Sequence, residues 1–141
     1  MMSLEGDLIP PVARSMTTGR GIVQEEQSAN AQPSGVRGAL LRIQAEASAG
    51  RYQEALKEAG VALVATRRLG LLQLEAAILQ EQALIFQILG QLDRAEASAR
   101  GALLAFERAT DNRGRVAAQQ VLEEIQAQRR ADPPSDTTRD S

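Results

Sequence analysis

The stretch Gly50–Leu56 reads GRYQEAL, and forty residues later the stretch Gly90–Glu96 reads GQLDRAE. Both place a large apolar residue two positions after the glycine and an alanine three positions beyond it. Small residues keep matching at helical spacing when residues 50–70 are aligned with 90–110. A fixed period in this range predicts stacked helix pairs, none of which can bury its apolar face alone. The identities are Gly50/Gly90, Ala55/Ala95, Ala59/Ala99, Ala62/Ala102, Leu63/Leu103, Ala65/Ala105 and Arg68/Arg108.

The apolar spacing is helical throughout the middle of the chain and predicts five helices. Glycines or a Thr-Asp-Asn turn separate them, as expected where helices end. The third helix is apolar on two sides, so we expect it to lie between neighbouring helices. Asp93 is expected to cap the fourth helix, with Glu96 completing a capping box. The expected helices span residues 36–49, 53–68, 71–89, 93–109 and 113–130.

These helices form one expected domain over residues 36–130, flanked by two segments without helical periodicity. Residues 1–35 are punctuated by proline and glycine, and we expect them to be disordered or extended. Residues 131–141 begin with a helix-stopping Asp-Pro-Pro and are expected to be disordered. An alternative for the first segment is a peptide that orders on a partner, using Leu8, Ile9, Val12, Ile22 and Val23.

The composition argues against several classes of function. The 141 residues include no cysteine and no histidine, which removes thiolate chemistry, the commonest general base and the commonest metal ligands. We therefore expect no cofactor and no metal. The net charge of -2 and the 2% of aromatic residues do not favour a nucleic-acid partner.

The chain also lacks the patterns of membrane insertion and export. It has no apolar run of about 18 residues, so we expect no membrane span. The start MMSLEGDLIPPVARSM carries acidic residues where a secretion leader would be basic, so the expected location is the cytoplasm.

Candidate catalytic groups are sparse. Lys57 is the only lysine and is expected on an exposed helix face, where a Schiff-base role is disfavoured. The adjacent carboxylates of Glu123 and Glu124 point in different directions around a helix and make no acid–base pair. The arginine pairs at residues 67–68 and 129–130 are explained by the negative dipole at helix ends. An enzyme is therefore the least favoured hypothesis.

At its matching residues the chain resembles the tetratricopeptide repeat family, in a variant longer than the usual repeat of about 34 residues. That family has a glycine at the turn, a large apolar residue two later, an alanine three beyond and another alanine seven after that. The matches are Gly50, Tyr52, Ala55 and Ala62, then Gly90, Leu92, Ala95 and Ala102, with Leu79, Ala83 and Phe86 in the preceding helix. The first helix departs from the pattern, with Ile43 at a usually small position and Glu46 at a usually aromatic one.

The resemblance covers about residues 36–128. It implies an all-α fold of antiparallel helix-pair repeats, an α-solenoid of about five helices and two and a half repeats. It also implies that the first helix of each pair lines a concave groove. The implied partner-binding residues are Arg37, Leu40, Gln44, Ala77, Gln80, Leu84, Gln87, Ile88, Ala117, Gln120, Glu124 and Gln128.

The implied groove has an apolar floor studded with glutamines. Glutamine both donates and accepts hydrogen bonds, so it can bind a peptide backbone without imposing charge. The alternative is that these glutamines are only solvated helix formers. The implied helices lack the lysines and asparagines with which some family members bind an acidic peptide tail.

Three hypotheses for function follow. The leading one is a non-enzymatic protein–protein interaction module, such as an adaptor, assembly factor or chaperone, that binds a peptide or amphipathic helix. The second is a regulatory or sensor module of a transcription or signalling system, and the third is an enzyme. Because a short repeat array leaves open end faces, and Leu41 lies on one of them, we expect a homodimer or a subunit of a larger assembly.

Overall fold

The computed structural model describes residues 32–131, and all the regular structure in that part of the chain is helical. The five helices agree with the expected ones to within a few residues at each end. The first begins earlier than expected, because residues 33–35 are helical and Pro33 occupies the first turn, where its missing N–H is no loss. Most of the two expected tails lies outside the described residues. The helices are α3 (Pro33–Ser48), α4 (Tyr52–Leu69), α5 (Leu72–Ile88), α6 (Leu92–Arg108) and α7 (Asn112–Ala131).

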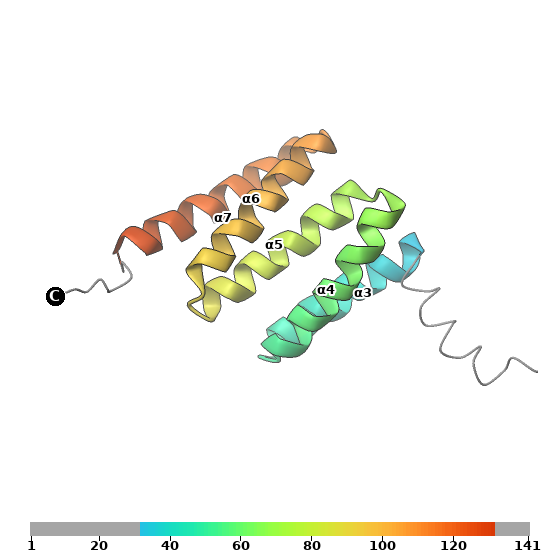
Figure 1. Ribbon diagram of the computed structural model, residues 1–141, viewed down its shortest axis with the longest axis horizontal. Helices are drawn as coiled ribbons and strands as arrows, with labels where there is room; N and C mark the ends of the chain where they lie inside the picture. The colour runs from blue at the N-terminus through green and yellow to red at the C-terminus, as the bar shows by residue number, and fades with distance from the viewer. Residues whose placement is uncertain (1–31, 132–141) are drawn as a thin grey trace, which may run out of the picture.

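The helices follow one another across the molecule in chain order, with α5 in the middle (Figure 1). Helices α3 and α4 form one antiparallel pair, α5 and α6 form the next, and α7 packs against both helices of the second pair. Helix α5 contacts α3, α4, α6 and α7, which confirms that its two apolar strips lie between neighbours. The all-α class is therefore confirmed, and the packing is consistent with a helical repeat.

The joints between helices repeat every twenty residues. Gly50, Gly70 and Gly90 each adopt a left-handed backbone with φ of 80°, 71° and 77°, and Thr110 takes the same place with φ of 51°. After each of these residues, the next backbone N–H donates to a carbonyl five residues back, at 2.8–3.0 Å. This pattern closes the helix C-terminus and turns the chain directly into the following helix. One helix and one joint therefore form a unit of twenty residues, half the forty-residue period seen in the sequence.

The expected cap at Asp93 is wrong. Helix α6 is preceded by Gln91, no side chain caps it, and Asp93 lies inside the first turn. Gln91, the residue directly after the left-handed Gly90, takes the N-cap position, so Asp93 falls two residues further on, within the helix. A side-chain cap occurs at the next joint, where Asp111 Oδ1 accepts the N–H of Gly114 at 2.9 Å.

The core is built from alanine stripes and a few isoleucines. The alanines that match between residues 50–70 and 90–110 are all buried, which lets the helices approach closely. Ile43, Ile78, Ile85 and Ile125 are the large side chains that are fully enclosed, and each comes from α3, α5 or α7. One polar side chain, Thr66, is also enclosed, and its hydroxyl donates to the carbonyl of Leu63 at 2.8 Å.

Candidate functional site

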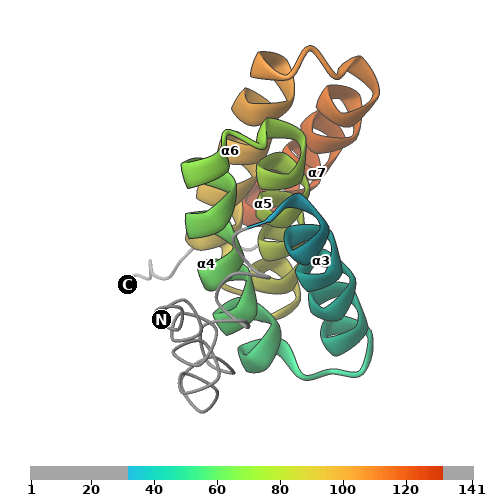
Figure 2. The same ribbon diagram turned by 90° about the vertical axis from the view of Figure 1, so that its right-hand side faces the viewer.

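Helices α3, α5 and α7 adjoin one another on one side of the molecule, and α4 and α6 lie on the other side (Figure 2). Two side-chain hydrogen bonds link the three helices. Gln44 of α3 donates to Glu81 of α5 at 3.2 Å, and Gln87 of α5 donates to Gln128 of α7 at 3.1 Å. We call the surface carried by these three helices the α3–α5–α7 face.

Leu84 lies between the two bridges. On α5 it lies on one helical ridge with Glu81, three residues earlier, and Gln87, three residues later. The bond to α3 therefore lies on one flank of Leu84, and the bond to α7 lies on the other. Leu84 is half-buried at this position, and Ile88, one turn further on, is exposed.

The sequence-derived binding residues divide by exposure into two groups, half-buried and exposed. Leu40 is half-buried because it packs against the core, so it offers little surface to a partner. Ala77, Gln80, Gln87 and Ala117 are also half-buried. The exposed members are Arg37, Gln44, Ile88, Gln120, Glu124 and Gln128.

Gln80 carries an incompletely paired polar group. Its Oε1 atom is buried and has no hydrogen-bond donor among residues 32–131. A buried acceptor without a donor costs free energy, and a donor on a partner would reach this shielded atom only after the Gln80 side chain changed rotamer. Gln80 precedes Glu81 in the chain and lies one turn before Leu84 on α5, so this acceptor belongs to the same stretch of the face.

The sequence reasoning missed Glu81, which joins α3 to α5. The binding positions on α5 were assigned by resemblance to the repeat family, and that assignment gave no role to the carboxylate of Glu81. The sequence did contain a signal for Glu81. It is a charged residue one turn before Leu84, whereas the equivalent position forty residues earlier is the apolar Leu41.

A second polar cluster joins α6 to α7. Arg129 of α7 forms ion pairs with Asp93, at 3.0 Å, and with Glu96. Glu96 also pairs with Arg100 and accepts from Gln126. The hydrogen bonds from Arg100 and Arg129 lower the pKa of the Glu96 carboxyl from its ordinary 4.5 to about 2. Arg129 therefore holds two helices together, beyond the dipole role expected for a basic helix end.

The candidate catalytic side chains Lys57, Glu123 and Glu124 are all exposed, and for Lys57 this exposure was expected. Within residues 32–131, no three acidic side chains come together as a metal site would require. In the same part of the chain, no helix has both the length and the apolar character needed to cross a bilayer.

Comparisons with protein families, with curated proteins and with solved structures found no match to this chain.

Proposed function

We propose that the protein is a non-enzymatic interaction module that binds a segment of another protein along the α3–α5–α7 face. The segment would be an extended peptide or an amphipathic helix. It would cover the apolar side chains of Leu84 and Ile88, and its polar groups would bond to the glutamines that flank them. Repeat folds present such faces because consecutive helices extend one continuous surface.

The observation that supports this proposal best is the arrangement around Leu84. Two interhelical bridges flank an apolar side chain, Ile88 extends the apolar surface into solvent, and Gln80 has an acceptor without a donor. Apolar area gives most of the binding free energy, and neutral amides fix the orientation of a partner backbone without demanding a charged ligand.

The test is capture of binding proteins from the native host at low salt, identified by mass spectrometry, with variants at two matched sites. Ile88→Glu introduces a charge on the α3–α5–α7 face at a side chain that is 61% exposed. Leu104→Glu introduces the same charge on α6, on the opposite side, at a side chain that is 48% exposed. Because both residues face solvent, both variants should fold, which circular dichroism would check.

We expect Ile88→Glu to lose a partner that Leu104→Glu retains, because only the first charge enters the contact. Gln80→Ala should weaken the same partner, because it removes the acceptor. Retention of every captured protein by both Ile88→Glu and Gln80→Ala would show that this face is not the binding surface.

A further inference from the structure

The N-terminal end of the array carries an apolar surface that no described residue covers. Leu41 of α3 is 66% exposed, and Val61 and Val64 of α4 are 52% and 56% exposed. We call the side of the α3–α4 pair that carries these three residues the N-terminal end face. Large apolar side chains grouped in this way mark a surface that has an occupant.

The repeat shows which way this face points. Forty residues on, the counterparts of Leu41, Val61 and Val64 are Glu81, Gly101 and Leu104. Glu81 bonds to Gln44 of the preceding pair. Gly101 and Leu104 line a hollow of about 360 Å³ that Arg67 of α4 also lines. In the second pair this side therefore faces the preceding pair, whereas in the first pair no preceding pair exists among the described residues.

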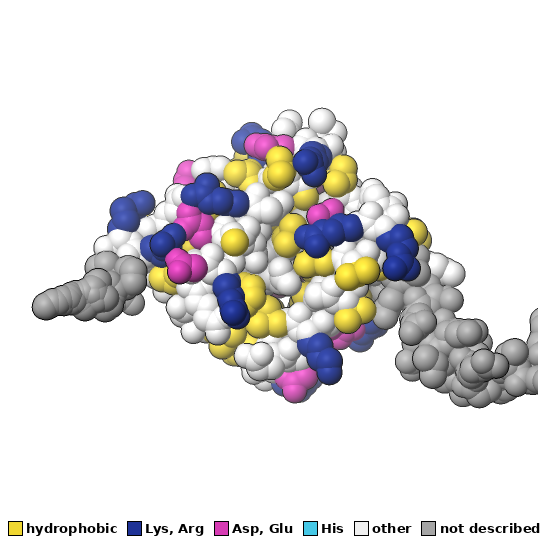
Figure 3. All heavy atoms as spheres, in the orientation of Figure 1, with side chains coloured by type: hydrophobic (Ala, Val, Ile, Leu, Met, Phe, Trp, Pro, Cys, Tyr) yellow, Lys and Arg dark blue, Asp and Glu magenta, His cyan; other side chains and the backbone are white. Residues whose placement is uncertain are grey.

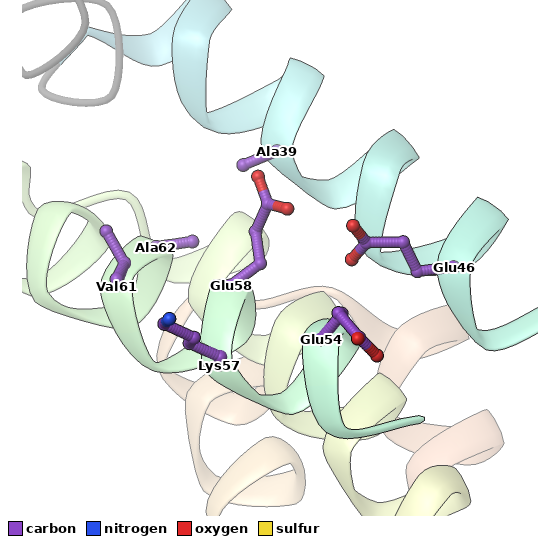
Figure 4. Close-up of a pocket in the computed structure, with 7 residues that line it drawn as sticks. All are labelled: Ala39, Glu46, Glu54, Lys57, Glu58, Val61 and Ala62. Carbon is purple, nitrogen blue, oxygen red and sulfur yellow. The ribbon is translucent and has the colours of Figure 1, made fainter. Parts of the chain in front are cut away.

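A cavity of about 320 Å³ opens on the same side of the first pair, between α3 and α4. Ala39, Ala62 and Val61 form its apolar part, and the carboxylates of Glu46 and Glu58 point into the space between the two helices (Figure 4). Glu58 is bonded to Arg42 at 2.6 Å. The Oε1 atom of Glu46 is buried without a hydrogen-bond donor in the described part of the chain.

The charge of this cavity favours a basic ligand. Three glutamates, at positions 46, 54 and 58, line it together with the single lysine, Lys57. An occupant that brought apolar side chains and one or two cations would cover the valines. It would also supply a donor to the carboxylate of Glu46.

We propose that residues 8–24 of the same chain occupy the N-terminal end face. This stretch reads LIPPVARSMTTGRGIVQ, and it contains two arginines, Arg14 and Arg20, and no acidic residue. Its apolar residues include the pair Ile22-Val23. The segment thus brings apolar side chains that can cover the exposed leucine and valines of the face. It also brings positive charge that complements the glutamates of the cavity.

Chain length permits this docking. Residues 24–32 separate Val23 from the start of α3, and an extended chain of that length reaches about 30 Å. Helix α3 has 16 residues and is about 24 Å long, so Ile22 and Val23 can reach any part of the end face.

A second copy of the protein fits the face less well. If two copies docked through this face with two-fold symmetry, the glutamates around the cavity of one copy would approach the same glutamates of the second copy. Like charges brought together in this way oppose association. The segment in residues 8–24 meets no such repulsion.

The test uses nuclear magnetic resonance on the full chain. Because the protein has no cysteine, Gln24→Cys creates a single site for a nitroxide label beside Val23 and leaves the apolar pair Ile22-Val23 intact. The methyl signals of Val61 and Val64 report on the N-terminal end face. The methyl signals of Val116, an exposed valine of α7, are the matched control.

We expect the label to broaden the signals of Val61 and Val64 and to leave those of Val116 sharp. Replacing Arg14 and Arg20 by glutamate should restore the lost signals, and replacing both by lysine should not. Equal intensities at all three valines would overturn the proposal.

A mixed sample identifies the occupant. Isotope-labelled chains without nitroxide are mixed with unlabelled chains that carry it. If the broadening survives in this mixture, the end face is occupied by another copy, and the intramolecular proposal is wrong. If the broadening is confined to chains that carry their own label, the proposal is supported.

Discussion

The two ends of the helix array are built differently. The N-terminal end face exposes Leu41, Val61 and Val64 around an acidic cavity. The outward side of α7 at the other end carries glutamine and glutamate, and Val116 is the one large apolar residue exposed on that helix. Terminal faces of a repeat array require polar covering. Helix α7 supplies that covering by its own composition, whereas the first pair leaves it to another segment.

The packing around the helices also differs between the two ends. At the C-terminal end, α7 is fastened to α6 by the ion pairs of Arg129 with Asp93 and Glu96. It is also fastened by the close approach of Gly114 to the ring of Phe106. At the N-terminal end, Gly60 of α4 has open space around it. The side of the molecule seen in Figure 3 carries separate apolar patches among Lys and Arg side chains. The C-terminal end is closed, because contacts between α6 and α7 hold its helices together. The N-terminal end is open, because apolar side chains of α3 and α4 stay exposed there.

The largest expected effect separates two glycines. A side chain at Gly114 would overlap the Phe106 ring, so Gly114→Ala should lower the free energy of unfolding by about 1–3 kcal/mol. At Gly60 a side chain meets nothing within 4 Å, so Gly60→Ala should raise it by about 0.5–1 kcal/mol. Urea denaturation measures both. Equal effects at the two positions would remove the distinction between a closed and an open end.

The next effect depends on pH. The carboxyl of Glu96 has its pKa lowered to about 2 in the folded protein, against an ordinary 4.5. The folded state therefore gains stability from this group above pH 4.5 and loses it as the pH falls towards 2. Glu96→Gln should lower the free energy of unfolding at pH 7 by about 1 kcal/mol. Thermal denaturation at several pH values should show the gap between the two proteins closing below pH 4.5.

Glu58→Gln is the matched variant at the other end. Among residues 32–131, Glu58 has a single arginine partner, Arg42, whereas Glu96 has two. We therefore expect Glu58→Gln to be milder than Glu96→Gln at pH 7. A larger loss for Glu58→Gln would mean that the N-terminal pair depends on its charges more than α7 does.

The smallest effect compares two exposed valines. Val64→Ser and Val116→Ser make the same exchange on helix surfaces of similar exposure, 56% and 47%. If residues 8–24 cover Val64, its replacement should cost about 0.5–1 kcal/mol more than that of Val116. Chemical denaturation of the full chain gives the difference. Identical costs would argue that both valines face water.

The sequence predicted the fold well because its strongest signals are local. The glycines at 50, 70 and 90 mark left-handed helix ends, and the alanines between them define a buried stripe. The twenty-residue spacing of the joints was missed because its fourth member is Thr110, which has a side chain that disfavours the left-handed backbone. Asp93 was assigned to a cap from its residue type and its spacing to Glu96, although the structure pairs it with Arg129 of another helix.

The proposed binding residues were less predictable. The resemblance implied Leu84 and Ile88 as groove positions, and the structure shows only that Leu84 is half-buried and Ile88 is exposed. The contacts of Gln44 with Glu81 and of Gln87 with Gln128 depend on how α3, α5 and α7 lie against one another. No local pattern encodes that arrangement, and the same holds for the cavity between α3 and α4.

The equal spacing of the joints bears on how such a chain can lengthen. Helices α4 to α7 begin at residues 52, 72, 92 and 112, each after a left-handed residue of the same geometry. A tandem duplication of residues 71–110 would add one antiparallel helix pair. Every helix after the added pair would keep its present direction. Duplication of a single helix and joint would reverse every helix that follows. Lengthening by duplication would therefore keep the directions of the following helices only if it added whole pairs of forty residues.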